Sequence, residues 1–234
     1  ALCVGGLEGL PSTWTTDVLP VDGLFDEPSG IAVDGRDGAL FVVDRGAHVV
    51  WRVGADGKNA TSFAGQVGQR GFAGDGGPAA LALLNAPTGA LLFAPTSGAA
   101  AGRHVLFVAD TGNDRVRRVD VDDEHRIVTV LGDGSAGSGG EGAPASAFPV
   151  LSPRGLAVDD GANLFVTSGS AVRLVQADTF TDPASEPGVV DPGDAVATVY
   201  GAPPRALFPE PVTRCLAGLA VAPPAPDTKA HATE

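Results

Sequence analysis

The strongest constraint on the fold is an internal repeat. The hexapeptide GDGGPA at 74–79 returns as GEGAPA at 140–145. In both copies a second proline follows the first by nine residues, at Pro87 and Pro153, and a glycine comes two residues after it. Matching offsets over this length indicate that the chain is an array of similar structural units.

Each unit carries the pattern of four short strands separated by turn residues. A glycine-containing strand such as PSGIAVD at 28–34 comes first, and an apolar strand such as ALFVVD at 39–44 comes second. Repeats of four short strands are typical of the blades of a β-propeller, so the sequence predicts an all-β fold. The other strands are predicted at 87–93, 153–159 and 217–222 (first), 105–110 and 163–168 (second), 48–53, 114–119 and 170–175 (third), and 61–65, 128–132 and 197–201 (fourth).

The composition of the strands predicts where each lies within a blade. The second strands are apolar at every position, as in LFVV at 40–43, which is expected when both faces of a strand are covered. The third strands mix valines with arginines, as in DRVRRV at 114–119. We expect these arginines near the rim, where their charged groups reach water. The best candidate for a helical turn is AALALLNA at 79–86.

The two ends of the chain complement each other. The segment 1–6 matches the second strand at 39–44, and the chain finishes soon after the first strand at 217–222. One interpretation is a closed four-bladed ring, which leaves no exposed sheet edge. The other is a part of a longer, six-bladed propeller, and the sequence leaves both open. The predicted single domain, 1–234, has units at about 19–65, 66–132, 133–201, and 202–234 paired with 1–18.

The two cysteines, Cys3 and Cys215, would both belong to the hybrid blade made by the two ends. If they form a disulfide, the chain occupies an oxidising, extracytoplasmic compartment, which is the location we favour. If they do not, each is a small buried hydrophobic side chain.

The units resemble NHL repeats. The likeness is carried by EPSGIAVDGRDGALFVVDRGAHVVWRV at 27–53, by ADTGNDRVRRVD at 109–120 and by the connecting segment GFAGDGGPAALALLNAPTG at 71–89. The resemblance covers about residues 19–222 and implies the fold without implying one function. NHL propellers include extracellular and ciliary scaffolds, RNA-binding modules attached to ubiquitin ligases, and the peptide-amidating lyase. Related six-bladed propellers include metal-dependent lactonases.

The charge balance disfavours several classes of partner. The chain has 15 Lys and Arg against 28 Asp and Glu, which gives a net charge of −13. A field of that sign repels phosphate backbones and anionic lipids, so we predict no nucleic-acid partner. The apolar runs are shorter than the ~20 residues that span a bilayer, so we predict no membrane insertion.

The glycine-rich segment at 71–89 has two interpretations. Glycine-rich loops cradle phosphates when they join a strand to the N-terminus of a helix. Here the segment leads through a proline into a strand, so we interpret it as a connection between blades whose glycines occupy turns of positive φ. It is also a candidate binding rim.

The turns after the second strands carry polar side chains, as in DRGAH at 44–48 and DTGND at 110–114, whereas SGS at 168–170 lacks the aspartate. Side-chain oxygens at such positions bond backbone N–H groups in tight turns. The functional interpretation is that they line one mouth of the channel and contact a ligand or partner. The candidate residues for this face are Arg45, His48, Asn113, Asp114 and Arg154, with Trp51 added if it is exposed.

No catalytic residue and no metal ligand is predicted. The acidic segments DVDDEHR at 120–126 and DGRDG at 34–38 suggest calcium but lack the complete ligand pattern of an EF-hand, so we predict no cofactor and keep calcium as the possible ion. The four histidines, His48, His104, His125 and His231, form no HxH or HxxxH pair.

These observations favour a non-catalytic binding or scaffold module that mediates protein–protein interactions within a larger assembly. Two insertions, at 94–102 and 177–194, are further candidate partner loops. The alternative is a propeller enzyme, a metal-dependent lyase or lactonase, with a divalent ion in the central channel.

Overall fold

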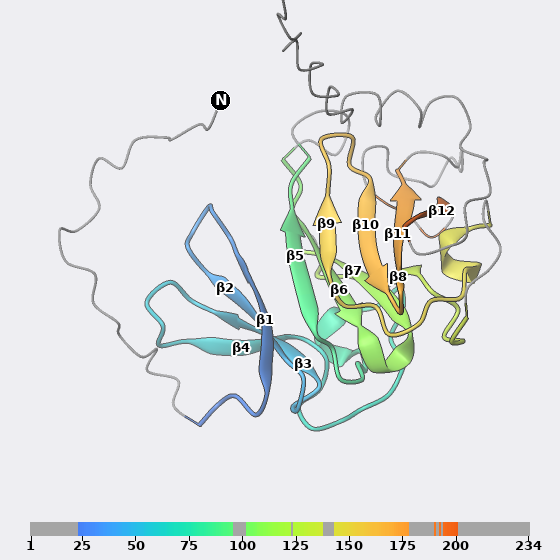
Figure 1. Cartoon of the computed structure of the whole chain (residues 1–234). Coiled ribbons are helices and arrows are strands. Elements are labelled where there is room, and N and C mark those ends of the chain that lie inside the picture. Colours follow the sequence, from blue (N-terminus) through green and yellow to red (C-terminus); the bar gives the residue numbers. More distant parts are fainter. Residues whose placement is uncertain are drawn as a thin grey trace, which may run out of the picture. The chain divides into compact units, whose positions relative to one another are not determined.

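Three four-stranded antiparallel sheets make up the described part of the chain in the computed structural model (Figure 1). The structure describes residues 23–95, 102–122, 124–137, 143–177, 190, 192 and 194–200, all within the compact unit Ala1–Gly201. The predicted strand at 217–222, the hybrid blade and both cysteines lie outside the described residues, so ring closure and blade number stay predictions.

Each sheet is one propeller blade, with its strands in sequence order from the inner to the outer edge. Blade 1 holds β1 (Pro28–Val33), β2 (Leu40–Asp44), β3 (Val49–Val53) and β4 (Ala60–Ala64); blade 2 holds β5 (Gly89–Phe93), β6 (Val105–Asp110), β7 (Arg115–Asp120) and β8 (Ile127–Leu131); blade 3 holds β9 (Leu156–Val158), β10 (Leu164–Ser168), β11 (Ala171–Gln176) and β12 (Ala195–Tyr200). The predicted all-β fold and its four-stranded units are confirmed.

Short 3₁₀ helices complete the secondary structure. Two of them, η1 (Ala79–Leu81) and η3 (Ala145–Ala147), lie at matching points of the two connections between blades, and η2 (Thr111–Asn113) follows β6. The helical turn predicted within 79–86 is therefore present as η1.

The apolar second strands are covered on both faces, as predicted. Phe41 and Val43 of β2 pack in a core shared with blade 2, whereas Val42 between them packs on the opposite face of blade 1. In β6, Leu106 belongs to the core shared with blade 1, and Phe107 belongs to the core shared with blade 3. Alternate side chains of one strand therefore fill two different cores, and polar side chains stand only at the strand ends, at Asp44 of β2 and Asp110 of β6.

The inner strands approach each other closely at their glycines. A Cβ added to Gly30 of β1 would lie 2.9 Å from the carbonyl oxygen of Thr88, just before β5. A Cβ on Gly89 of β5 would collide with the carbonyl oxygen of Arg154, before β9. Figure 1 shows β5 and β9 side by side. Gly30 and Gly89 are therefore required by backbone packing between neighbouring blades.

One β-bulge recurs in every blade between the third and fourth strands. The pairing register shifts between Val50 and Trp51, between Val116 and Arg117, and between Val172 and Arg173. A bulge increases local twist and re-aims the side chains beside it. The bulge therefore lies at the equivalent point of the third strand in all three blades.

The prediction that the third-strand arginines reach water is wrong for three of them, whereas Arg52 and Arg115 are partly exposed. Arg117 is fully buried, and Arg118 and Arg173 are nearly so. The reason is that the fourth strand and the inter-blade connection cover the third strand, and the arginines meet acidic or polar side chains there. Trp51 occupies the same position in blade 1 and is only 7% exposed, so it does not meet the condition set for a partner anchor.

Candidate functional site

A polar side chain at the end of each second strand holds the backbone that leads into the first strand of its blade. In blade 1 the carboxylate of Asp44 accepts hydrogen bonds from the N–H groups of Asp26 and Glu27, both at 2.9 Å. In blade 2 Asp110 Oδ1 accepts a 2.8 Å bond from the N–H of Asn85. We name Asp44, Asp110 and their counterpart in blade 3 the clasp residues.

The third clasp residue is Ser168. Its hydroxyl accepts a 2.9 Å bond from the N–H of Leu151 and donates one of 3.1 Å to the carbonyl of the same residue. This turn lacks the aspartate of the other two, and the hydroxyl of Ser168 holds the equivalent backbone segment instead. The clasp residues therefore bond backbone groups of their own blade, which is the first of the two interpretations of these turns, and not the ligand contact of the second.

A second set of turn residues binds the next connection. His48 and Asp114 occupy equivalent left-handed positions, with φ of 60° and 52°. The N–H of Ala86 donates to His48 Nδ1 at 3.0 Å, and the N–H of Ser152 donates to Asp114 Oδ1 at 2.6 Å. Both candidate partner residues therefore hold the connection that leads from their own blade.

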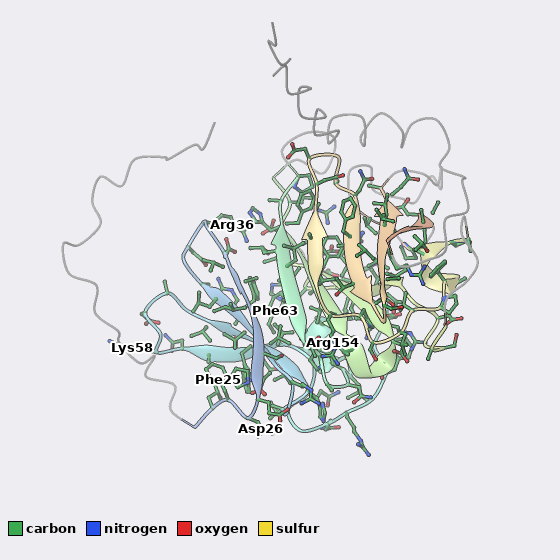
Figure 2. All side chains as sticks on the ribbon, in the orientation of Figure 1. Phe25, Asp26, Arg36, Lys58, Phe63 and Arg154 are labelled. Atoms are coloured by element: carbon green, nitrogen blue, oxygen red, sulfur yellow. The ribbon has the colours of Figure 1, made fainter. Side chains whose placement is uncertain are left out.

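The other candidate face residues are placed differently. Asn113 donates through Nδ2 to the carbonyl of Gly71 and to the carboxylate of Asp110, at 2.7 and 2.8 Å. Arg45 is half-exposed and pairs with Glu27 at 2.7 Å. Arg154 is exposed and lies just before β9 (Figure 2). Contact of any of these five residues with a ligand or partner stays a prediction.

In blades 1 and 2 the position after the bulge contacts the clasp residue of its own blade. In blade 1 the indole Nε1–H of Trp51 donates to Asp44 at 3.3 Å. In blade 2 the guanidinium of Arg117 lies 3.4 Å from Asp110 through one terminal nitrogen and bonds Asp75 through the other. An indole in blade 1 and a guanidinium in blade 2 therefore fill the same role, which is to donate to the clasp carboxylate.

Asp75 comes from the connection between blades 1 and 2 and lies over the outer edge of blade 2. The N–H of Gly76 donates to the carbonyl of Ile127 at 2.8 Å, which fixes the connection to β8. Thr129 of β8 donates its hydroxyl hydrogen to Asp75 Oδ2 at 2.7 Å. The carboxylate is thus held by Arg117 on one oxygen and by Thr129 on the other, and its side chain is still 39% exposed.

The exposed side of Asp75 lines an open cleft with a volume of about 660 Å³. One wall is Phe72, whose ring is 3.7 Å from the guanidinium carbon of Arg115. Arg115 also donates to the carbonyls of Asn113 and Asp133 at 2.9 and 2.6 Å. We name this feature the Asp75 cleft, and its lining comprises Phe72, Asp75, Gly76, Arg115, Val128, Thr129, Gly132, Asp133, Ser146, Ala147 and Pro192.

The carboxylates around the cleft differ in proton affinity. Burial raises the pKa of Asp110 to about 6, although bonds from Asn113 and Asn85 and the charge of Arg117 oppose this shift. The hydroxyl and N–H of Ser135 lower the pKa of Asp133, which keeps that carboxylate ionised at neutral pH. Asp133 lines the cleft together with Asp75, whereas Asp110 is buried beneath it.

Asp75 was recognisable in the sequence as an acidic residue of the connecting segment, but its place in a site was not predicted. Its partner Arg117 lies 42 residues further along the chain. The only signal available was an acidic residue in one repeat matched by Glu141 in the other, which lies outside the described residues.

The two acidic segments weighed for calcium are joined by an arginine. Arg36 bonds Asp34 in its own turn and pairs with Asp122 at the edge of blade 2 (Figure 2 shows Arg36). Its hydrogen bond to Asp34 lowers the pKa of that carboxyl to about 2. Asp122 also accepts a 2.7 Å bond from the N–H of His104. Among the described residues no three His, Cys, Asp or Glu side chains gather as a group that could hold a metal ion.

No protein-family model matches the chain, and no curated protein matches it. Among solved structures it is similar to a structural genomics protein of unknown function from Bacteroides thetaiotaomicron VPI-5482, with 17% identity and a TM-score of 0.49 over 71% of this chain and 34% of that one. It is also similar to an auxiliary nutrient binding protein from Bacteroides ovatus ATCC 8483, with 18% identity and a TM-score of 0.44 over 58% of this chain and 33% of that one. A third similarity is to a nidogen/laminin complex, with 17% identity and a TM-score of 0.41 over 64% and 44%. The chain spans about a third of the length of the two bacterial structures.

Within the described residues, none of the helices has the length and apolar character needed to cross a membrane.

Proposed function

We propose that this protein is a binding module of the NHL type, which presents the connection between blades 1 and 2 to a protein partner. The observation that carries the proposal is a set of exposed apolar side chains on that connection. Val67 is 55% exposed, Phe72 is 43% exposed and Leu81 is 68% exposed. Exposed apolar groups on a folded surface often mark sites of protein interaction.

The connection is rigid enough to serve as such a surface. Its backbone bonds blade 2 through Ala79 N–H to the carbonyl of His125 at 2.8 Å, and it bonds itself through Gly71 N–H to the carbonyl of Leu84 at 3.0 Å. The side-chain amide of Gln66 donates to the carbonyl of Leu81 at 2.8 Å, which brings the turn beside Val67 next to Leu81. A surface ordered before binding loses little conformational entropy when the partner docks.

Site-specific photo-crosslinking in an extract of the source organism tests the proposal. A photoreactive phenylalanine analogue replaces Leu81, and a matched variant carries it at Lys58, in the exposed turn between β3 and β4 (Figure 2). We expect a discrete protein adduct from position 81 and none from position 58. Equal labelling at both positions, or no adduct at 81, would contradict the proposal.

The enzyme alternative rests on the resemblance to propeller lyases and lactonases, and it requires a divalent ion. Thermal unfolding with and without EDTA separates the two functions. A melting temperature that falls on chelation would favour the enzyme, and an unchanged one would favour the binding module. An extracytoplasmic location is part of the same proposal, and a count of free thiols on the purified chain tests it through Cys3 and Cys215.

A further inference from the structure

The Asp75 cleft contains a charged pair that the framework of the blade does not need. In blade 1 the third-strand donor to the clasp is the neutral indole of Trp51. In blade 2 the same position holds Arg117, a fully buried cation with an Nε that has no hydrogen-bond partner. A buried charge costs free energy unless it is paired, and a neutral side chain of similar size often serves as well. The second terminal nitrogen of Arg117 has a different use, which is to hold Asp75.

The carboxylate of Asp75 is fixed in position and has room for another donor. Arg117 occupies one oxygen and Thr129 the other, each through a single bond. A carboxylate has about four acceptor sites, so accepting capacity remains on the exposed side that lines the cleft. A group fixed by two contacts needs little reorganisation when a ligand donor arrives.

The charges that face the cleft favour a cation. Asp75 and Asp133 both line it. Arg115 lines it too, but its terminal nitrogens donate to two backbone carbonyls and its guanidinium stacks on Phe72. Arg117 lies beneath Asp75 and shares its charge with the buried Asp110. The whole chain carries a net charge of −13, which adds a long-range attraction for basic partners.

The cleft also has an apolar wall suited to a long side chain. Phe72 is 43% exposed beside the carboxylate, and Val128, Ala147 and Pro192 are the other apolar side chains of the lining. Lysine and arginine side chains combine an apolar stem with a charged head. We infer that the Asp75 cleft binds a lysine or arginine side chain from an exposed segment of the protein partner. This inference rests on the proposed function and names the chemistry of its partner.

In this arrangement Asp75 contacts the cationic head, Phe72 contacts the stem, and Arg117 and Thr129 are positioning residues. A guanidinium matches a carboxylate better than an ammonium does, because it donates through two parallel bonds. We therefore expect arginine to bind more tightly than lysine.

Amide chemical-shift titration of the full chain tests the inference. The probes are three blocked peptides, acetyl-GGRGG-amide, acetyl-GGKGG-amide and acetyl-GGQGG-amide. We expect saturable shifts at Gly76, Thr129 and Gly132 with the arginine and lysine peptides and none with the glutamine peptide. Equal binding of all three peptides, or binding of none of them, would overturn the inference, and no variant is needed to see this.

Variants assign the contact. Asp75→Asn is expected to weaken the arginine peptide at least tenfold, and Phe72→Ala several-fold. The matched control is Asp160→Asn, which removes the same charge from an exposed turn outside the cleft and leaves affinity unchanged. Equal weakening in Asp75→Asn and Asp160→Asn would mean attraction to net charge alone and would overturn the site.

Three further outcomes test the inference and separate it from the proposed function. Tighter binding of n-propylguanidinium than of the arginine peptide would overturn the assignment to a protein segment, because it would show that the cleft excludes a peptide backbone. A crosslinked partner at position 81 without peptide binding would contradict the inferred cleft site and support the proposed binding module. Peptide binding without a crosslinked partner would support binding of a basic side chain in the cleft and contradict the proposed function.

Discussion

Blades 1 and 2 place different chemistry at the same point of the same framework. After the shared bulge, blade 1 has Trp51 donating to Asp44, and blade 2 has Arg117 reaching both Asp110 and Asp75. An indole offers one neutral donor, whereas a guanidinium offers five donors and a charge. In blade 1 one neutral donor is enough for the clasp, so the second contact of Arg117, with Asp75, calls for an explanation outside the framework.

The largest effect is expected from removing the clasp of blade 1. Asp44 is fully buried and accepts bonds from Asp26, Glu27, Ala47 and Trp51. Asp44→Ala leaves several donors without an acceptor and is expected to lower the free energy of unfolding by about 4 kcal/mol, since each orphaned group costs about 1–3 kcal/mol.

In blade 3 the clasp is a hydroxyl that serves one residue, Leu151. Ser168→Ala is therefore expected to cost only about 1 kcal/mol. Urea denaturation of both variants makes the comparison, and equal losses would contradict the view that the clasps differ in strength.

The inner-strand glycines come next. A methyl group on Gly89 would meet the carbonyl oxygen of Arg154, and Gly89→Ala is expected to cost about 3 kcal/mol because backbone must move. A methyl group on Gly30 has a looser contact, at 2.9 Å from the carbonyl of Thr88, and Gly30→Ala is expected to cost about 1–2 kcal/mol. Thermal or urea unfolding measures both, and a Gly89→Ala variant as stable as the parent would show that the blades can separate freely.

Proton affinity sharpens the comparison between the two clasps. Burial acts to raise the pKa of Asp44, but the bonds from Glu27, Asp26, Ala47 and Trp51 outweigh it and the pKa is lowered. For Asp110 burial prevails and the pKa rises to about 6. Carboxyl carbon NMR titration is expected to show Asp44 titrating below its ordinary 3.8 and Asp110 near 6.

The two clasp carboxyls therefore make the free energy of unfolding change with pH in opposite directions. A lowered folded-state pKa means that Asp44 contributes stability above its unfolded pKa of 3.8 and loses it as the pH falls. For Asp110 the folded-state pKa is raised, so its contribution to stability is fully present below pH 3.8 and is lost as the pH rises through about 6. Coincident titration midpoints for the two carboxyls would contradict this difference.

The smallest effect is expected at the surface link between the blades. Arg36 pairs with Asp34 and Asp122 but is 43% exposed, so solvent screens the pairs and Arg36→Gln is expected to cost at most about 1 kcal/mol at neutral pH. Because the pKa of Asp34 is lowered to about 2, this contribution is present above 3.8 and vanishes as the pH falls to about 2. Unfolding of Arg36→Gln at pH 7 and pH 2 measures it, with Arg52→Gln as the control that loses a single exposed pair.

Much of the fold was predictable because it depends on local patterns. Continuous apolar runs such as LFVV at 40–43 require two covered faces, and the strand ends fell within a few residues of the prediction. The exception is β9, which begins at Leu156 rather than 153, because the N–H of Gly155 donates to the hydroxyl of Thr167 and ladder pairing starts one residue later.

The site was less predictable because its contacts are long-range. The clasp role of Asp44 was one of the two interpretations offered, since an aspartate after a strand bonds local backbone. The burial of Arg117 was missed, because a run of arginines in a strand normally indicates solvent. Arg117 can be buried because it pairs with Asp75, which the connection from the preceding blade brings close to it.

The separation of framework from binding site is tested most directly by one variant measured twice. Asp75→Asn is compared with the parent in urea unfolding and in titration with acetyl-GGRGG-amide. Because Asp75 is partly exposed and Arg117 keeps Asp110, we expect a loss of about 1 kcal/mol in stability and at least a tenfold loss of peptide affinity. A loss of about 3 kcal/mol or more with affinity unchanged would show that Asp75 belongs to the framework and not to a binding site.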